Sequence, residues 1–512
     1  MVDVTSRKAM GVLFGGAIGV TLLVQVYLWQ HIADDAFITF RYAERLVAGF
    51  GLTFNDGERV EGFSNPSWTV LLAVLKFVTS ISVPDVARGL GLLSSVLTLY
   101  VVVAIVRSLD KGISIHVLSV ALMLIVASPG FHVYATAGLE GPLLGLLLVV
   151  AVLQTLKGDT HGAATALGLA AITRPEGLLY GLLWLFTIGN RRKSLVGLIR
   201  GRSLDIALIV FLPAMWLIFR LWYFESWLPN AAIAKPPGTF GGLVILPSYV
   251  QPWIIALGGP MILLPWFLLH PTRNPSQVKI MSASLGLLIA AAIFLFYARG
   301  DWMPFGRFVV PVWPLVAAGF AVWFVPAFLE MRVRGFFRYA RWVAPVMYFA
   351  LFSCSVFAWQ VQVRRYVANN EMYMLMRGTD QLTVGAWLSG SVKEGSTVAI
   401  ARLGGIAYAA PRLFVWDLNG LTDKEEALFV ADGRPGGVNA DPVLSRKPDV
   451  LALVDVPVEW GYKSDSELMD WIKRRYTLTR SFPQGTYGAV DVWVADDRIE
   501  SILRKDMYRE GG

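Results

Sequence analysis

Two adjacent carboxylates follow the first hydrophobic run of this chain. Residues 9–28 are apolar, and Asp34 and Asp35 come shortly after them. About 20 apolar residues cross a bilayer, so the pair stands where membrane meets water. A charged group there costs free energy to place, which points to a function. Such a carboxylate could act on a substrate whose other end lies in lipid, whereas the alternative is a simple cap of a surface helix.

We expect the pair to begin a helix. On a helix that starts at Asp34, that residue and Arg41 share one face, two turns and about 10 Å apart along the axis. This distance suits a base at one end and a cation that binds phosphate at the other. The alternative is an amphipathic helix on the membrane surface with ordinary paired charges.

The next segment, residues 49–68, is dense in glycine, asparagine, glutamate and aromatic residues. It contains an Asn-Asp-Gly turn signal and ends where Pro66 can open a helix. Aromatic faces stack on sugar rings, while carboxylates and amides bind hydroxyl groups. The segment is therefore a candidate sugar-binding loop, or else a stiff loop without a ligand. Its candidate ligands are Glu58, Glu61, Asn65 and Trp68.

The composition indicates a membrane protein. Hydrophobic residues make up 55% of the chain and charged residues 16%, whereas soluble chains carry about 25% charged residues. Much of the net charge of +8 lies in short basic clusters between apolar runs. That distribution follows the positive-inside rule, so the charge does not call for nucleic acid. The single cysteine, Cys354, excludes an intramolecular disulfide, and the N-terminal run is expected to be an uncleaved signal-anchor.

The apolar runs predict about eleven spans. Basic clusters place residues 190–202, 271–279 and 331–341 in the cytoplasm, so the loops 31–66, 224–249 and 299–307 face outward. Two runs complicate the count, because 67–80 either crosses or re-enters and 163–189 is interrupted near Arg174. The predicted spans are 9–29, 67–80, 86–106, 113–128, 139–156, 163–189, 203–223, 250–270, 279–298, 308–330 and 341–360.

The character of the chain changes after the last span. Residues 361–512 alternate strand-like runs with a helical stretch, which is typical of a small α/β domain. The strand-like runs are 397–400, 413–417, 450–454 and 490–495, and the helical stretch is 466–475. We therefore predict two domains, a membrane domain over 1–360 and a soluble domain over 361–512, with the second domain outside the cytoplasm.

Ordered motifs along the chain resemble a known group of enzymes. The first loop carries Asp34-Asp35, Arg41-Tyr-Ala-Glu44 and Phe54-Asn-x-Gly-Glu-Arg-Val-Glu-Gly-Phe-Ser-Asn-Pro-x-Trp68. Further matches are Thr136-Ala-Gly-Leu-Glu140, Thr173-Arg-Pro-Glu-Gly177, Leu228-Pro-Asn230, Ala234-Lys235, Gly300-Asp-Trp-Met-Pro-Phe-Gly-Arg307, Gly404-Gly-Ile-Ala-Tyr408 and Asp417-Leu-Asn-Gly-Leu-Thr-Asp423. Together they resemble bacterial GT-C glycosyltransferases, most of all the actinobacterial terminal arabinofuranosyltransferases.

The resemblance implies a polytopic α-helical membrane protein with the GT-C fold, about eleven transmembrane helices and a C-terminal extracytoplasmic α/β domain. It also implies a polyprenyl-phosphate-sugar donor and a glycan acceptor outside the plasma membrane. An acid of the first outer loop would deprotonate the acceptor hydroxyl, which displaces the lipid phosphate with inversion. Asp34 matches the leading acid of the family, and Asp35 is the reserve. Partial burial beside its neighbour would raise the pKa of such a base.

For the donor phosphate the candidates are Arg307, helped by Lys235, Arg174 and Arg41. Arg307 stands in an outward loop that opens a span, where a guanidinium and a helix N-terminus can combine. Arg174 interrupts an apolar run, and its pairing with a nearby acid is an equally good explanation. Candidate contacts to sugar or acceptor are Glu140, Asn230 and Asp301.

The scattered histidines show no metal-ligand spacing, so we predict no obligatory metal, although a divalent cation is possible. Two alternatives to arabinofuranose transfer remain. One is transfer of mannose, galactose or an aminoarabinose to lipopolysaccharide or protein. The other is a flippase or transporter of lipid-linked sugar that does no chemistry, which would need charges lining a path through several spans.

Overall fold

The computed structural model describes most of the chain in two compact units. The described residues are 4–108, 114–188, 201–234, 275–298, 303, 305–333, single positions between 353 and 364, 378–431, 446–455, 466–484 and 488–503. Unit 1 comprises Met1–Gln30, Ala87–Trp216 and Pro237–Met372. Unit 2 comprises His31–Val86, Leu217–Pro236 and Tyr373–Gly512.

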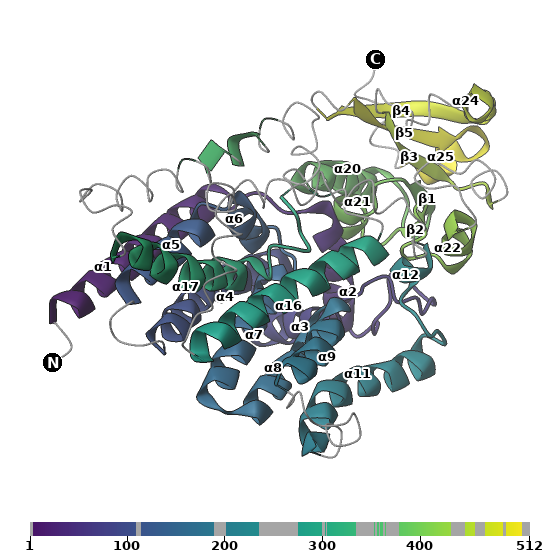
Figure 1. Cartoon of the computed structure of the whole chain (residues 1–512). Helices are drawn as coiled ribbons and strands as arrows, with labels where there is room; N and C mark the ends of the chain where they lie inside the picture. Colours follow the sequence, from purple (N-terminus) through teal and green to yellow (C-terminus); the bar gives the residue numbers. More distant parts are fainter. Residues whose placement is uncertain are drawn as a thin grey trace. The chain divides into compact units, whose positions relative to one another are not determined.

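The described elements of unit 1 are helices (Figure 1). Two of them, α4 and α11, extend past the boundary into unit 2. The helices are α1 (Val4–Tyr27), α4 (Val83–Arg107), α5 (Ser114–Val126), α6 (Pro129–Thr136), α7 (Gly141–Lys157), α8 (Thr160–Thr173), α9 (Glu176–Ile188), α11 (Ser203–Tyr223), α16 (Pro275–Tyr297) and α17 (Trp313–Val333).

Four helices among the described residues are long and apolar enough to cross a membrane, namely α4, α11, α16 and the part Lys8–Tyr27 of α1. The bent pair of α5 and α6, which turns by 57° at its break, is a fifth candidate. Shorter apolar helices are Pro66–Thr79, α7, the part Glu176–Phe186 of α9 and the part Trp313–Pro326 of α17. The total of eleven spans stays a prediction, because the run 250–270 and most of 341–360 lie outside the described residues.

The interrupted run 163–189 forms two helices, α8 and α9, as the sequence suggested. Arg174 separates them in an extended conformation (φ −151°, ψ 147°). Pro175 follows, and a proline disfavours the helical conformation in the residue before it. The break therefore has a local cause.

Two contacts between α1 and α4 show the relative direction of these helices. Arg88, near the start of α4, donates a hydrogen bond to the carbonyl of Trp29, just past the end of α1. Farther along, the rings of Phe14 and Tyr100 are 6.3 Å apart, so the two helices run antiparallel. Whether the run 67–80 crosses or re-enters stays open, as in the sequence analysis.

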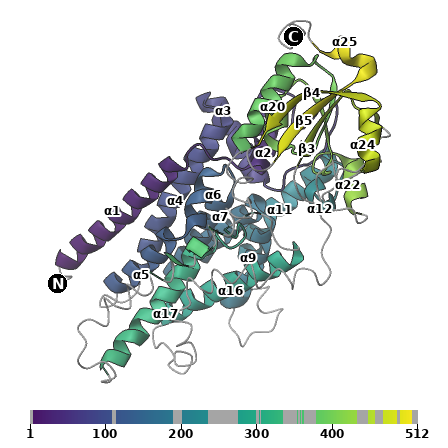
Figure 2. The same ribbon diagram turned by 90° about the horizontal axis from the view of Figure 1, so that it is seen from above.

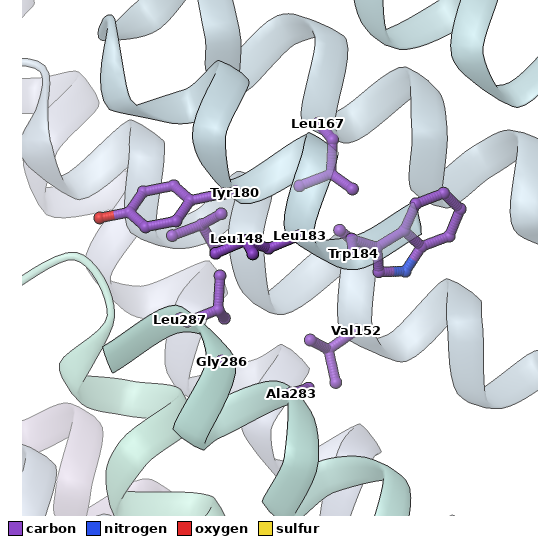
Figure 3. Close-up of a pocket in the computed structure, with 10 residues that line it drawn as sticks. Leu148, Val152, Leu167, Tyr180, Leu183, Trp184, Ala283, Gly286 and Leu287 are labelled. Atoms are coloured by element: carbon purple, nitrogen blue, oxygen red, sulfur yellow. The ribbon is translucent and has the colours of Figure 1, made fainter. Parts of the chain in front are cut away.

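Helices α7, α8, α9 and α16 line a small, partly open apolar pocket of about 30 Å³ (Figure 3). Leu148, Leu167, Trp184 and Leu287 contribute to its wall. The ring of Tyr180 also lines it, while the hydroxyl points away from the other labelled side chains (Figure 3). Its wall is mostly apolar and offers few partners to a polar ligand, so we interpret this pocket as a packing feature of unit 1.

Unit 2 combines helices from two distant parts of the chain with a five-stranded sheet in the order β2-β1-β3-β5-β4. The first three strands of that order run parallel, and β5 and β4 are antiparallel to their neighbours. Helices α20 and α24 lie on opposite faces of the sheet (Figure 2). The elements are α2 (Asp34–Val47), α3 (Pro66–Thr79), α12 (Asn230–Ala234), α20 (Gly378–Ser391), β1 (Thr397–Ile400), α21 (Gly404–Ala409), β2 (Phe414–Asp417), α22 (Lys424–Ala431), β3 (Val450–Asp455), α24 (Ser466–Lys473), β4 (Tyr476–Pro483), β5 (Ala489–Ala495), η3 (Asp496–Arg498) and α25 (Ile499–Ile502).

The four predicted strands coincide with β1, β2, β3 and β5 to within one residue at each end. The sequence missed β4. That strand lies at the edge of the sheet, and most of its side chains between Tyr476 and Phe482 are at least partly exposed on both faces. Such a strand lacks the alternation of buried and exposed residues by which a half-buried strand is recognised.

The predicted domain boundary at 360 does not coincide with the units, because the first loop belongs with the tail. Asn55 shows why. Its side-chain amide donates to the carbonyl of Val415 at 2.8 Å and accepts from the N–H of Val415 at 3.0 Å. Val415 lies on β2, an edge strand, so the loop satisfies backbone groups that an edge strand leaves unpaired.

Candidate active site

The acidic pair begins α2, as predicted. Ala33 before it is extended, and Asp34 and Asp35 form the first turn. Both side chains are half-buried. Negative charge is favourable at a helix N-terminus, where backbone N–H groups point outward. The pair therefore occupies the end of the helix at which the backbone favours negative charge.

Asp34 also binds the start of a second helix from the tail. Its Oδ1 accepts from the backbone N–H of Gly405 at 2.8 Å, and its Oδ2 accepts from that of Gly404 at 3.2 Å. Burial raises the pKa of Asp34, and the charge of Asp35 adds to this, while the two amides and Arg402 act in the opposite direction. The carboxylate is thus held in one place by groups that favour its charge.

Arg41 is bound to the backbone. Its Nε donates to the carbonyl of Phe54 at 2.9 Å, Nη1 to those of Ala407 and, at 3.2 Å, Ala410, and Nη2 to that of Leu413 at 3.3 Å. The residue is only 3% exposed, and burial lowers its pKa to about 9. With all three nitrogens donating to carbonyls, this placement favours a role in holding the backbone over the predicted role in binding donor phosphate.

Asp34 and Arg41 therefore contact the two ends of the same short helix, α21. The acid meets its first amides and the cation meets carbonyls at its end, which matches the polarity of a helix dipole. Between them, Phe37 and Phe40 place their rings 5.3 and 6.2 Å from that of Tyr408. The spacing that suggested a base and a phosphate ligand is also the spacing needed to grip α21.

Three of the four candidate sugar ligands in the first loop are buried. Glu61 is 2% exposed, Asn65 6% and Trp68 1%. Glu58 is half-buried, and its Oε2 accepts from Asn55 at 3.0 Å. Burial raises the pKa of Glu58. Of these four residues, Glu58 is the one whose side chain is open enough for a sugar to reach.

The buried members of this set make specific contacts inside unit 2. Glu61 pairs with Arg220, with Nη2 3.2 Å from Oε1 and a second, shorter contact from Nε. Asn65 Oδ1 accepts from the hydroxyls of Thr39 at 3.3 Å and Thr69 at 3.2 Å. These contacts connect the first loop to α11 and join α2 to α3. They give the loop a fixed shape.

Asn230 is likewise bound to the tail. Its Nδ2 donates to the carbonyls of Gly420 at 2.6 Å and Asp423 at 2.9 Å, and its N–H donates to the carbonyl of Glu61 at 2.8 Å. The turn that it holds is closed by Asp417, which accepts from the N–H of Thr422 at 2.8 Å. Asn230 thus connects the first loop to the turn after β2.

An acidic cluster beside this turn contains Glu426, which was not singled out from the sequence. Glu426 is 2% exposed, and its Oε1 has no hydrogen-bond partner among the described residues. Burial, with Asp423 and Asp417 nearby, raises the pKa of Glu426 to about 8, and burial raises that of Asp417 to about 6. Arg446 pairs with Asp423. The two adjacent acids at the start of α22 were the sequence signal for this cluster.

In unit 1, Arg174 forms the pairing that the sequence offered as its alternative role. Its Nε is 2.5 Å from Oε1 of Glu176, and its Nη1 is 2.5 Å from Oε1 of Glu140. All three residues are buried. Arg307 belongs to the same group, because the guanidiniums of Arg174 and Arg307 lie 5.1 and 5.0 Å from the ring of Phe308.

Two predicted site residues, Lys235 and Asp301, lie outside the described residues. Within the described part of the chain, no group of three or more histidine, cysteine or acidic side chains is placed to hold a metal ion. The prediction that no metal is obligatory stays a prediction.

Comparison with known sequences gives two kinds of match. Residues 370–500 match a family described as a domain of unknown function (DUF8728). The chain is 31% identical over 299 residues to a terminal beta-(1->2)-arabinofuranosyltransferase of Mycobacterium tuberculosis, over 54% of this chain and 45% of that protein. A protein of the same name from Corynebacterium glutamicum is 25% identical over 336 residues, 56% and 47% of the two chains. The chain spans about half the length of these curated relatives.

Solved structures match a larger share of this chain than the sequence relatives do. ArnT from Cupriavidus metallidurans, bound to undecaprenyl phosphate, matches 94% of this chain and 97% of its own with a TM-score of 0.57 and 13% identity. The archaeal oligosaccharyltransferase AglB from Archaeoglobus fulgidus, in complex with an inhibitory peptide and a dolichol-phosphate, matches 93% and 74% with a TM-score of 0.52 and 13% identity.

This chain has the GT-C fold. At such low identity the likeness concerns the fold alone, and a fold does not by itself define a function. The sequence matches add a resemblance to arabinofuranosyltransferases within the GT-C glycosyltransferases. Both findings agree with the motifs of the first loop.

The predicted site residues that the structure describes fall into two groups, one in each unit. The group in unit 2 contains Asp34, Asp35, Arg41, Glu58, Glu61, Asn65, Trp68 and Asn230. The group in unit 1 contains Glu140, Arg174 and Arg307. Sequence reasoning missed the contact of Gly404 and Gly405 with Asp34, although a glycine pair separated by three residues from the end of a predicted strand was visible.

Proposed function

We propose that this chain transfers an arabinofuranosyl group from a polyprenyl phosphate to a glycan acceptor, with inversion, at the outer face of the plasma membrane. The carrying observation is the carboxylate pair at the start of α2, with Asp34 half-buried and held by two backbone amides. The sequence relatives named arabinofuranosyltransferases support the choice of sugar. The undecaprenyl phosphate bound by the structural neighbour ArnT supports the choice of donor.

In the proposed reaction Asp34 is the general base. It takes the proton of an acceptor hydroxyl as that oxygen forms a bond to the anomeric carbon of the donor. The bond between the anomeric carbon and the phosphate oxygen breaks, and polyprenyl phosphate leaves with the electron pair. Each oxygen of Asp34 accepts one amide and keeps a second lone pair for the proton. Burial raises the pKa of Asp34, which brings a carboxylate closer to the pKa of an effective base.

The other residues take roles that fit their contacts. Asp35 lies beside the base and is its reserve. For the departing phosphate we keep the predicted assignment to Arg307, with Arg174, which pairs with Glu140 and Glu176, as its helper. Glu58 is the proposed sugar contact of the first loop. Lys235 and Asp301 keep their predicted roles as further phosphate and sugar contacts, and no metal is required.

The test is transfer by the purified full chain with a synthetic polyprenyl-phosphate arabinofuranose and an arabinan oligosaccharide. Wild type is expected to transfer, while Asp34→Asn should reduce kcat at least about 10²-fold, the lower range for loss of a general base. Asp496→Asn is the matched control, an exposed acid of the tail. Full transfer by both Asp34→Asn and Asp35→Asn would contradict the assignment of the base.

The same assay separates the alternatives. Donors that carry mannose, galactose or aminoarabinose, offered in competition, should be used more slowly than the arabinofuranose donor. Faster use of one of them would overturn the choice of sugar. In vesicles that hold labelled donor on one side, translocation without transfer would establish the flippase function and overturn the enzyme.

A further inference from the structure

Gly404 approaches Asp34 more closely than any side chain would permit. A Cβ built on Gly404 would lie within 3.0 Å of three Asp34 atoms, at 2.7 Å from the carbonyl carbon, 2.6 Å from Oδ1, and closest to the carbonyl oxygen. Two of these are backbone atoms, which cannot rotate away. Only glycine allows this close approach of two backbones. Position 404 is therefore constrained by the acidic pair, through a contact between residues 370 positions apart.

The helix that begins at Gly404 is held on its other sides as well. Arg41 binds the carbonyls of Ala407 and Ala410 at its far end. On the side of α20, a Cβ on Gly385 would overlap the carbonyl of Ile406. Because α21 cannot retreat toward α20 or slide along α2, added volume at position 404 has to be taken up by Asp34.

We propose that Gly404 is a positioning residue for the acidic pair, so that the tail of the chain sets where the base stands. The proposal rests on the proposed function. The tail then contributes to catalysis by positioning Asp34, in addition to its other contacts. Its first helix fixes the Asp34 main chain by close approach and the Asp34 carboxylate by two amides.

The proposal has two measurable consequences. Misplacement of a reacting group by about 1 Å costs about 10²-fold in rate. Loss of the amide hydrogen bonds removes groups that favour the carboxylate, so the pKa of Asp34 rises. The acidic limb of the pH profile of kcat should then move to higher pH. A variant that only reduced the folded fraction would lower the apparent kcat and leave the profile in place.

The experiment compares Gly404→Ala with Gly390→Ala in the full chain. Gly390 lies in α20 of the same unit and has open space around it, so its variant should behave as wild type. For Gly404→Ala we expect kcat about 10²-fold lower, a KM for the donor within about twofold because no proposed phosphate ligand is touched, and an acidic limb at higher pH. Thermal unfolding reports the folded fraction of each.

A second variant covers the case in which Gly404→Ala does not fold. Tyr408→Phe keeps the ring packing and removes the hydroxyl that lies 3.3 Å from Oε1 of Glu44. It should lower kcat severalfold at an unchanged KM. Wild-type kcat and pH profile in the folded variants would overturn the positioning role alone. If wild-type protein itself showed no transfer with any donor, the proposed function would fall, and the positioning role with it.

Discussion

The side-chain amide of Asn55 makes hydrogen bonds to both the N–H and the carbonyl of Val415, as the backbone of an adjacent strand would. The two residues are 360 positions apart in the sequence. Asn55 belongs to the first loop after α2, and Val415 belongs to β2 at the edge of the sheet. The pair is one of several contacts through which the acidic helix and the tail form a single compact unit. Perturbing these contacts should therefore change both stability and catalysis.

Replacing Asn55 by alanine should destabilise unit 2 by about 2–4 kcal/mol, because both backbone groups of Val415 lose a buried partner. Asn55→Asp replaces the donor by a carboxylate oxygen beside Glu58 and the carbonyl of Val415, so it should destabilise at least as much as alanine. Thermal unfolding of the detergent-solubilised protein measures both. Equal stability of the alanine variant and wild type would show that the loop does not support the edge of β2.

Replacing Arg41 by lysine distinguishes its two possible roles. Lysine lacks the planar fork of five donors and cannot reach four carbonyls, so α21 should loosen. We expect lower stability and lower kcat, with the KM for the donor nearly unchanged. Arg59→Lys is the matched control, since Arg59 is an exposed arginine of the same loop. A large rise in the donor KM without loss of stability would restore the phosphate role.

Glu61 and Arg220 should show strong coupling in a double-mutant cycle. The side chains are 1% and 15% exposed, and removal of one partner of a buried pair leaves a charge without compensation, at about 3–5 kcal/mol. We expect each single substitution to methionine to be destabilising and the double variant to be less so than the sum. Additive effects would mean that the pair contributes no interaction energy.

The stability of unit 2 should fall as pH rises from about 4.5 to about 8. The pKa of Glu426 is about 8 in the fold against an ordinary value of 4.5. Between these values the folded chain retains a proton that the unfolded chain has lost, so unfolding becomes easier as pH increases. Glu426→Gln should flatten this slope in unfolding measured at several pH values. Glu425→Gln, at an exposed neighbour, should not change it.

Loss of Arg307 should weaken donor binding. A charge-assisted hydrogen bond contributes about 1.5–3 kcal/mol, so Arg307→Gln is expected to raise the donor KM about 10- to 100-fold. Arg174→Gln should chiefly lower stability, because it leaves Glu140 and Glu176 buried without their shared cation. If Arg174→Gln had the larger effect on KM with stability retained, the two arginines would exchange roles.

The sequence by itself determined the features that depend on neighbours along the chain. Hydropathy located the long apolar helices that the structure describes but not the short helices α6 and α12. The break between α8 and α9 follows from Pro175 and its preceding residue. The start of α2 at Asp34 and the strand Thr397–Ile400 were likewise predictable. Each of these follows from a local rule about periodicity, charge or proline, so a short window of sequence suffices.

Only the tertiary structure decided what the predicted site residues contact. Asp34 and Arg41 grip α21, and Asn230 holds the turn after β2, through partners 190 or more positions away. A window along the chain contains no information about such partners, because an amide or carbonyl of a distant helix looks the same as any other. For that reason a spacing that suggested a base and a phosphate ligand corresponds, in the fold, to a carboxylate and a guanidinium that contact the two ends of α21.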